Sequence, residues 1–355
     1  MKFTEIAKNF NPAWFAAVMG TAVIPLVLSF LNFPFLYVVN VCFFVLALLM
    51  GLLVLIPWTA KLLFYRENSV KDLNHPILAH FFPTMPIALI IIAMDFLKMP
   101  SALFASATSQ ALAFWLWVLG SAGIYIFGFI IMMRVFSHKG ITPAHANFGW
   151  FIPPVSLLII PAGGLELAAL YPQTMELTIG LSLMSFGIGV FLFLFVGAAV
   201  FHRYIYHELP MSRLVPTVFV GMAPTAIIAV VLFKMMQLFE HQDVLGIAPQ
   251  VFAPLAKIAI IGNWGFSVWW FVMACIVISH YIRKIELPYA LTWWAFTFPS
   301  GALCLASAVA WKVTQFSSFY VFFVGATVFM LIVWLIVLLK TAKGVASGKI
   351  FLPAP

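Results

Sequence analysis

The stretch that decides the fold spans residues 288–313, PYALTWWAFTFPSGALCLASAVAWKV. No charged side chain lies between Pro288 and Lys312, and the stretch exceeds the roughly 20 residues that a helix needs to cross a bilayer. Pro299 stands near its middle, where the proline ring removes one backbone hydrogen bond and presses on the preceding turn. The stretch therefore predicts a bent transmembrane helix, with the bulky ring of Phe298 directly before the bend.

The composition extends this prediction to the whole chain. Of its 355 residues, 65% are hydrophobic and only 8% are charged, whereas a soluble domain needs a polar exterior. The alternating pattern of a membrane barrel is absent, so we expect an all-α integral membrane protein that forms a single transmembrane domain over 1–355. Ten spans are expected, at about 13–31, 35–57, 75–97, 110–136, 145–169, 175–203, 214–239, 253–282, 288–313 and 318–341.

The formal net charge of +8 is distributed like that of a membrane protein, so no nucleic-acid partner is expected. If the connections between spans are assigned alternately to the two sides, 14 of the 18 Lys and Arg residues fall on one side. The four on the other side are Lys98, Lys234, Lys257 and Lys312. The positive-inside rule then predicts a multi-pass protein of the cell membrane with both termini in the cytoplasm, which requires an even number of spans.

Prolines divide the ten spans into two kinds. The odd-numbered spans carry internal prolines, whereas the even-numbered spans have none near the middle. The prolines of the odd spans are Pro25, Pro83, Pro86, Pro153, Pro154, Pro161, Pro224 and Pro299. This alternation predicts five helical hairpins, each pairing a bent helix with a straight one. Because loosened backbone is tolerated only against protein or a water-filled cavity, the odd helices should lie inside and the even ones outside.

Several motifs, in order along nearly the whole chain, resemble one known family. They are Asn11–Thr21 (NPAWFAAVMGT), His75–Pro76 (HP), His80–Pro83 (HFFP), Trp150–Pro154 (WFIPP) and Trp293–Pro299 (WWAFTFP). Together they resemble the tellurite-resistance/dicarboxylate transporter family. That family includes bacterial tellurite-resistance membrane proteins, yeast malic-acid permeases, fungal sulfite efflux pumps and the slow anion channels of plant guard cells.

The resemblance implies ten helices as five hairpins in quasi-fivefold order around a central pore, assembled as a homotrimer. It also implies that a phenylalanine of the ninth helix plugs the pore, and Phe298 stands at the matching position. Gly20 in the first helix and either Phe81 or Phe82 in the third are the pore-lining positions carried over. Packing is the ordinary role of any one of 38 phenylalanines, so only the resemblance singles out Phe298 as a gate.

Further pore-lining positions are expected at small polar residues and prolines of the odd spans. They are Thr21, Pro83, Pro153, Pro154, Pro224, Thr297 and Pro299. Carbonyl oxygens freed by prolines repel anions, so attraction must come from the positive ends of helix dipoles and from basic side chains. Lys234 and Lys312, near the extracellular ends of odd helices, either form an anion-attracting vestibule or reach the lipid headgroups. Glu166 is expected to be solvated at a helix end.

These features favour a transmembrane anion transporter or channel for C4-dicarboxylates such as malate, for sulfite or for small inorganic anions. Its partners would be that anion and membrane lipid, with no cofactor or metal, because Cys42, Cys275 and Cys304 have no ligand spacing. The alternative is a membrane-embedded enzyme acting on a lipid-like substrate, but the ten carboxylates are scattered and form no catalytic cluster. A sensor or scaffold would normally carry a soluble domain. The sequence fits a channel and a proton-coupled carrier equally well.

Overall fold

A computed structural model describes residues 2–31, 33–137, 140–241 and 245–351, in which every regular element is a helix. Long single helices are α3 Leu36–Phe64, α6 Ser106–Ser137, α8 Met175–Tyr206, α10 Pro249–Lys284 and α12 Ser317–Ala346. They alternate with shorter α-helices, α2 Phe15–Leu28, α5 Thr84–Lys98, α7 Ile152–Leu170, α9 Ala223–His241 and α11 Phe298–Thr314. Two short helices, α1 Phe3–Lys8 and α4 Arg66–Leu73, lie outside this alternation.

Each of the shorter α-helices continues a 3₁₀ segment. These segments are η1 Pro12–Trp14, η2 Leu78–Phe81, η4 Phe148–Phe151, η6 Val215–Met222 and η7 Leu291–Phe296. Counted with them, nine helical stretches of the described residues are long and apolar enough to cross a membrane, and the tenth, Pro12–Leu28, is a shorter apolar helix. The prediction of an all-α integral membrane protein is therefore confirmed, and the helices lie within a few residues of the expected spans. The remaining elements are η3 Pro143–His145, η5 Pro172–Thr174 and η8 Lys349–Phe351.

Burial separates the two sets of spans. In the most apolar stretch of each odd-numbered span from the third onward, 83–94% of the residues are buried inside the protein. In the even-numbered spans this share is only 17–33%, although these spans are on average the more apolar set. In α2 nearly every residue is buried. The odd-numbered spans therefore form the interior of the protein, and the others turn most of their apolar surface outward.

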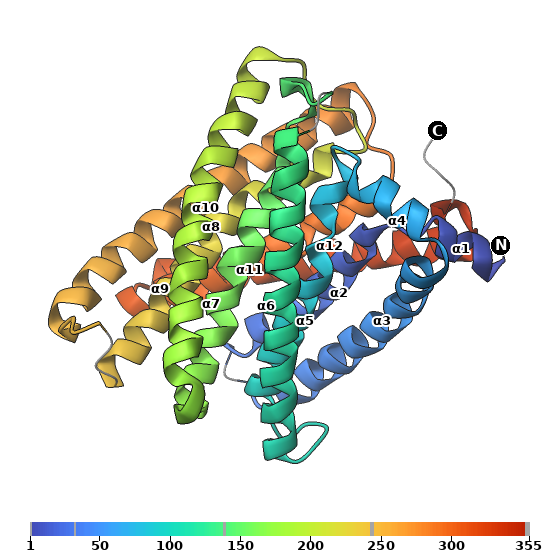
Figure 1. Cartoon of the computed structure of the whole chain (residues 1–355). Coiled ribbons are helices and arrows are strands. Elements are labelled where there is room, and N and C mark those ends of the chain that lie inside the picture. Colours follow the sequence, from blue (N-terminus) through green and yellow to red (C-terminus); the bar gives the residue numbers. More distant parts are fainter. Residues whose placement is uncertain (1, 32, 138–139, 242–244, 352–355) are drawn as a thin grey trace.

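The packing of the helices follows the same division. Each inner helix packs against the outer helix that follows it, giving the pairs α2–α3, α5–α6, α7–α8, α9–α10 and α11–α12. The inner helices also pack against one another in a closed cycle, α2–α5–α7–α9–α11 and back to α2. The long outer helices α6 and α8 run along the bundle in Figure 1, with inner helices beside them. Because an outer helix returns the chain after each inner one, the five inner helices run in the same direction.

The prolines of the inner spans correct one expectation. A proline was expected to bend a continuous α-helix, but in four inner spans it stands where a 3₁₀ segment gives way to an α-helix. These prolines are Pro83, just before α5, and Pro153, Pro154, Pro224 and Pro299, in the first turns of α7, α9 and α11. The first-turn N–H groups of an α-helix have no partner within the helix, so a proline there removes no helical hydrogen bond. Pro86 likewise lies in the first turn of α5, so among the described prolines of the inner spans Pro25 and Pro161 are the two that stand deeper inside an α-helix.

The first and last described segments meet at one end of the bundle. The ring of Phe351 in η8 stacks on Trp14 in η1, with centroids 5.6 Å apart. Figure 1 shows α1 and the end of α12 on the same side of the molecule. This arrangement agrees with an even number of spans. We refer below to the opposite end, where the five inner helices finish, as the far end.

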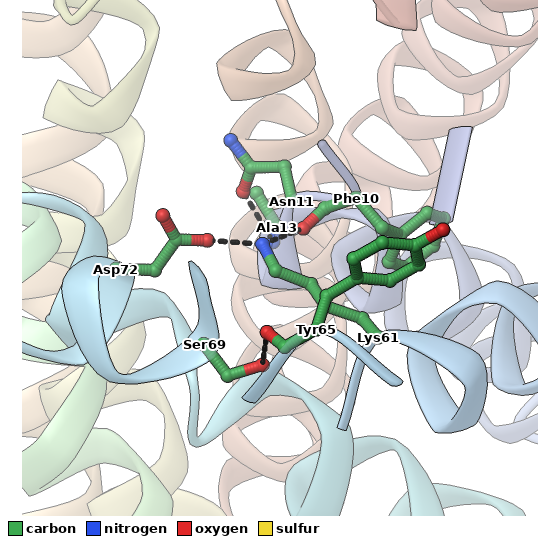
Figure 2. Close-up of polar contacts among 7 residues, drawn as sticks. All are labelled: Phe10, Asn11, Ala13, Lys61, Tyr65, Ser69 and Asp72. Atoms are coloured by element: carbon green, nitrogen blue, oxygen red, sulfur yellow. Dashed lines mark hydrogen bonds and ion pairs between the residues drawn. The ribbon is translucent and has the colours of Figure 1, made fainter. Parts of the chain in front are cut away.

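A buried lysine fixes the start of the first inner span (Figure 2). The Nζ of Lys61, which is only 2% exposed, pairs with the carboxylate of Asp72 in α4 and donates a hydrogen bond to the carbonyl of Phe10 at 2.7 Å. Directly after Phe10, the side chain of Asn11 accepts a hydrogen bond from the N–H of Ala13 and caps η1. Lys61 thus holds α3, α4 and the entry to η1 together rather than facing solvent.

Candidate functional site: a closed apolar cavity between the inner helices

All five inner helices contribute to one small cavity of about 20 Å³. Its eleven lining residues are apolar, with two from each of α2, α5, α7 and α9 and three from α11. One water molecule would fit in this volume, but apolar walls offer it no hydrogen bond. The space between the inner helices is therefore closed to any hydrated ion in this conformation.

Phe298 is the aromatic residue in this lining. It is the first residue of α11, directly after η7, and is 6% exposed. The hydroxyl of Ser300 donates a hydrogen bond to the carbonyl of Phe296 at 2.7 Å, which ties the first turn of α11 to η7. The junction between the two helix types thus places the Phe298 ring against the cavity, together with Ala302 and Leu305 of the same helix.

Gly20 of α2 makes a close contact with Thr297, the residue that links η7 to α11. A Cβ atom added to Gly20 would overlap the hydroxyl of Thr297 and lie 2.7 Å from its Cβ. The Thr297 hydroxyl donates to the carbonyl of Trp294 at 2.8 Å, so it has little freedom to move away. Both residues were expected to line a pore, but their contacts place them at a helix–helix interface next to Phe298.

Thr21 and Phe82, also expected in the pore, contact outer helices. The hydroxyl of Thr21 accepts a hydrogen bond from Trp334 of α12 at 3.1 Å. The ring of Phe82 lies 5.3 Å from that of Trp58 in α3 and 5.5 Å from that of Phe127 in α6. Neither residue lines the cavity.

The other expected pore-lining residues lie at or near the junctions between 3₁₀ segments and α-helices. Phe81 ends η2 and approaches Gly149 of η4, where an added Cβ would lie 3.5 Å from its ring. Pro83, Pro153, Pro154, Pro224 and Pro299 mark the junctions described above and do not line the cavity. Of the expected site residues, the structure places Phe298 alone in the cavity wall.

Charged side chains gather at the far end of three inner helices. Lys234 of α9 donates a hydrogen bond to Glu166 Oε1 of α7 at 2.8 Å and another to the carbonyl of Ala162. Lys98, the last residue of α5, lies 3.5 Å from the same oxygen of Glu166. We call Lys98, Glu166 and Lys234 the triad. Glu166 was expected to be solvated, but its side chain is only partly exposed and lies between two lysines, because α5 and α9 flank α7.

The predicted pair Lys234 and Lys312 is not brought into one group. Lys312 is exposed at the end of α11, where its Nζ lies over the Trp311 ring, 4.9 Å from the centroid. A further carboxylate was not anticipated from the sequence: Asp95 of α5 is fully buried, and neither oxygen has a hydrogen-bond partner among the described residues. It follows Met94 of the cavity wall. No group of three or more His, Cys, Asp or Glu in the described part of the chain could hold a metal ion.

A multi-pass protein whose inner helices enclose a closed apolar cavity, with cationic side chains beside one end of it, has the construction of a membrane transporter or channel. The chain belongs to the SLAC1 family, described as voltage-dependent anion channels, whose family model matches residues 9–342. This finding confirms the family that the sequence motifs indicated and assigns the protein to anion transport.

Similar proteins cover nearly the whole chain. Two transporters of Methanocaldococcus jannaschii named as uncharacterized, MJ0576 and MJ0762, are each 33% identical. The first alignment covers 98% of this chain and 96% of the relative, and the second covers 97% of each. The sulfite efflux pump SSU1 of Arthroderma otae is 28% identical over 97% of this chain and 92% of its own length. All are named as transporters or pumps, so the alternative of a membrane-embedded enzyme finds no support.

Proposed function

We propose that this protein moves small anions across the cell membrane along the axis of the five inner helices, and that the ring of Phe298 closes the path. The observation that supports this proposal is the cavity to which every inner helix contributes and whose wall includes Phe298. An anion would pass when the ring turns away and the apolar space hydrates. A hydrophobic constriction of this kind gates by excluding water.

Sulfite and C4-dicarboxylates such as malate are the proposed substrates. Sulfite is suggested by the fungal relatives named sulfite efflux pumps, and malate by the sequence motifs shared with dicarboxylate permeases. In all five inner spans the α-helix begins only after a 3₁₀ segment, so its positive N-terminal end lies within the span. Such partial charges attract an anion weakly, and weak contacts favour passage because a deep well would trap the ion.

The assembly proposed for this path is a homotrimer with both termini in the cytoplasm. The outer helices leave most of their apolar residues exposed, which lipid or a neighbouring copy would cover. The excess of Lys and Arg on the side of the termini supports the cytoplasmic orientation. The far end of the inner helices, with the triad, would then face the outside of the cell.

The test is the variant Phe298→Ala in proteoliposomes, with uptake of sulfite, malate, chloride and nitrate measured with and without a pH gradient. Removing the ring should raise the uptake of at least one anion about tenfold or more, because no other aromatic ring lines the cavity. Phe296→Ala is the matched control. This substitution also removes a phenylalanine ring, two residues before Phe298. The Phe296 ring does not line the cavity, and its centroid lies 4.9 Å from that of Phe219.

The comparison between the two variants decides the proposal. If Phe298→Ala folds normally and transports no more than the parent, Phe298 does not close the path. If Phe296→Ala raises uptake equally, loosened packing rather than a gate explains the result. A dependence on the pH gradient identifies a proton-coupled carrier, and its absence a channel.

A further inference from the structure

The triad continues the cavity wall along three inner helices. Lys98, Glu166 and Lys234 each come four residues after a residue that lines the cavity. Those residues are Met94, Ala162 and Val230. Residues four apart share one face of an α-helix and are separated by about 6 Å along its axis. The triad therefore lies one helical turn beyond the cavity, on the faces that enclose it.

Hydrogen bonds join the triad directly to the cavity wall. Lys234 donates to the carbonyl of Ala162, so its ammonium group lies against a lining residue. Its side chain is 11% exposed, that of Glu166 is 22% exposed and that of Lys98 is 42% exposed. Exposure thus increases from Lys234 through Glu166 to Lys98, so the triad is reached most easily at Lys98.

Lys98 also borders a larger pocket at the far end. This pocket measures about 360 Å³ and lies between α2, α3 and α5, where Asn40 and Ser29 are its other polar side chains near the inner helices. The Asn40 side chain is buried, and its Oδ1 has no hydrogen-bond partner among the described residues. A volume of this size accommodates a small organic anion. Of the triad, Lys98 borders this pocket, so an anion held there would lie against the more exposed of the two lysines.

We propose that Lys98 and Lys234 form the outer binding site for the transported anion, and that the Glu166 carboxylate occupies this site while no anion is bound. The proposal rests on the proposed function, since it gives the path its anion site. Two positive groups and one negative group leave a net charge of +1 between three helices. An incoming carboxylate or oxyanion replaces Glu166 on the lysines, and Glu166 returns when the anion moves on.

The contacts of Glu166 define the chemistry of the ligand. The Oε1 atom of its carboxylate faces both ammonium groups, at 2.8 Å from the Nζ of Lys234 and 3.5 Å from the Nζ of Lys98. A carboxylate of a C4-dicarboxylate or an oxygen of sulfite presents the same acceptor. Buried charges within a membrane are costly and persist only when paired, so a site that exchanges one carboxylate for another avoids leaving bare lysines.

The competing explanation is that the triad only holds α5, α7 and α9 together and binds no anion. Transport measurements on triad variants distinguish this structural role from the proposed anion site. Uptake is measured against external anion concentration in the Phe298→Ala background, with sulfite and malate as probes. Glu166→Gln should lower the half-saturating concentration at least threefold, because the internal competitor loses its charge. Lys234→Met should raise it at least tenfold, and Lys98→Met should raise it less because Lys98 is more exposed. Lys257→Met, on the outer helix α10 at the same end, controls for general surface charge and should change nothing.

A second measurement does not depend on transport. Addition of malate or sulfite should raise the thermal unfolding midpoint of Glu166→Gln more than that of the parent, because a bound ligand stabilises the folded state. Lys234→Met should show no such rise. A clamp without a binding role is established if both variants lower thermal stability while half-saturation and the ligand-induced shift stay unchanged.

The two measurements also distinguish a failure of the proposed gate at Phe298 from a failure of the proposed anion site at the triad. If Phe298→Ala gives no transport at all, the proposed gate fails, and the ligand-induced shift alone then decides whether the triad binds anions. If transport is gained but neither substitution moves half-saturation, the path stands and the assignment of the triad is overturned.

Discussion

The substitution Gly20→Ala tests the contact that brings α2 against the start of α11. The added methyl would overlap the Thr297 hydroxyl and lie 2.7 Å from the Thr297 Cβ, whereas ordinary contact begins at 3.4 Å. The Thr297 side chain cannot simply rotate away, because its hydroxyl donates to the carbonyl of Trp294 at 2.8 Å. Either this hydrogen bond breaks or the two helices separate.

Both outcomes destabilise the protein by an amount that can be bounded. Overpacking a well-packed interior by one methyl costs typically about 1–3 kcal/mol. Loss of the hydrogen bond adds about 1 kcal/mol. We therefore expect Gly20→Ala to lower the free energy of unfolding by about 2–4 kcal/mol. Gly128→Ala is the matched control, since nothing lies within 4 Å of an added Cβ there, and it should change stability by less than about 0.5 kcal/mol.

Equilibrium unfolding in mixed micelles, followed by tryptophan fluorescence, measures these differences. A double-mutant cycle with Thr297→Ala, which removes the hydroxyl, should return about 1 kcal/mol or more of the loss. The single variant Thr297→Ala should itself cost about 1 kcal/mol through its lost hydrogen bond. Equal stability of Gly20→Ala and the parent, or strict additivity of the two substitutions, would refute the close contact between Gly20 and Thr297.

Two further substitutions probe the interior. Lys61→Met leaves the Asp72 carboxylate and the Phe10 carbonyl without their hydrogen-bond donor. It should lower the free energy of unfolding by about 3 kcal/mol in the same assay. The control Lys71→Met, on the exposed face of α4, should change it by almost nothing. A loss below about 1 kcal/mol for Lys61→Met would mean that the pair is not buried in the native protein. Pro154→Ala should change stability by less than about 1 kcal/mol, because Pro154 stands in the first turn of α7, and a larger loss would show that the ring itself holds a bend.

The division into inner and outer helices was predictable because it follows from the positions of the prolines, whose effect on the backbone is local. Proline restricts its own backbone and its neighbour's, so irregular helix can be located without knowing what packs against it. Phe298 was a different case. Its place beside Pro299 was visible, but it entered the site only through the family motif, since the sequence contains 38 phenylalanines with the same chemistry.

Contacts between helices that are distant in sequence could not be predicted in the same way. The 3₁₀ segments depend on how five helices fit together, and the apolar sequence before each proline is compatible with either helix type. Glu166 and Lys234 are 68 residues apart, and only the packing of α7 against α9 brings them together. The hydrogen bond that Thr21 accepts from Trp334 of α12 joins residues 313 positions apart and could not be predicted either.

Under the proposed function, five inner helices also explain why one ring would suffice to close the path. Helices in contact have axes about 8–10 Å apart, so five of them in a closed cycle place their axes about 7–8.5 Å from the common centre. Each helix with its side chains has a radius of about 5–6 Å, which leaves a central space only about 2 Å in radius. Apolar side chains fill most of such a space, as the 20 Å³ cavity shows, and in the proposed path the single phenylalanine ring in its wall is enough to exclude a hydrated ion. By the same geometry a four-helix cycle leaves almost no central space and a six-helix cycle leaves a wider one, so the proposed single aromatic gate fits a cycle of five inner helices.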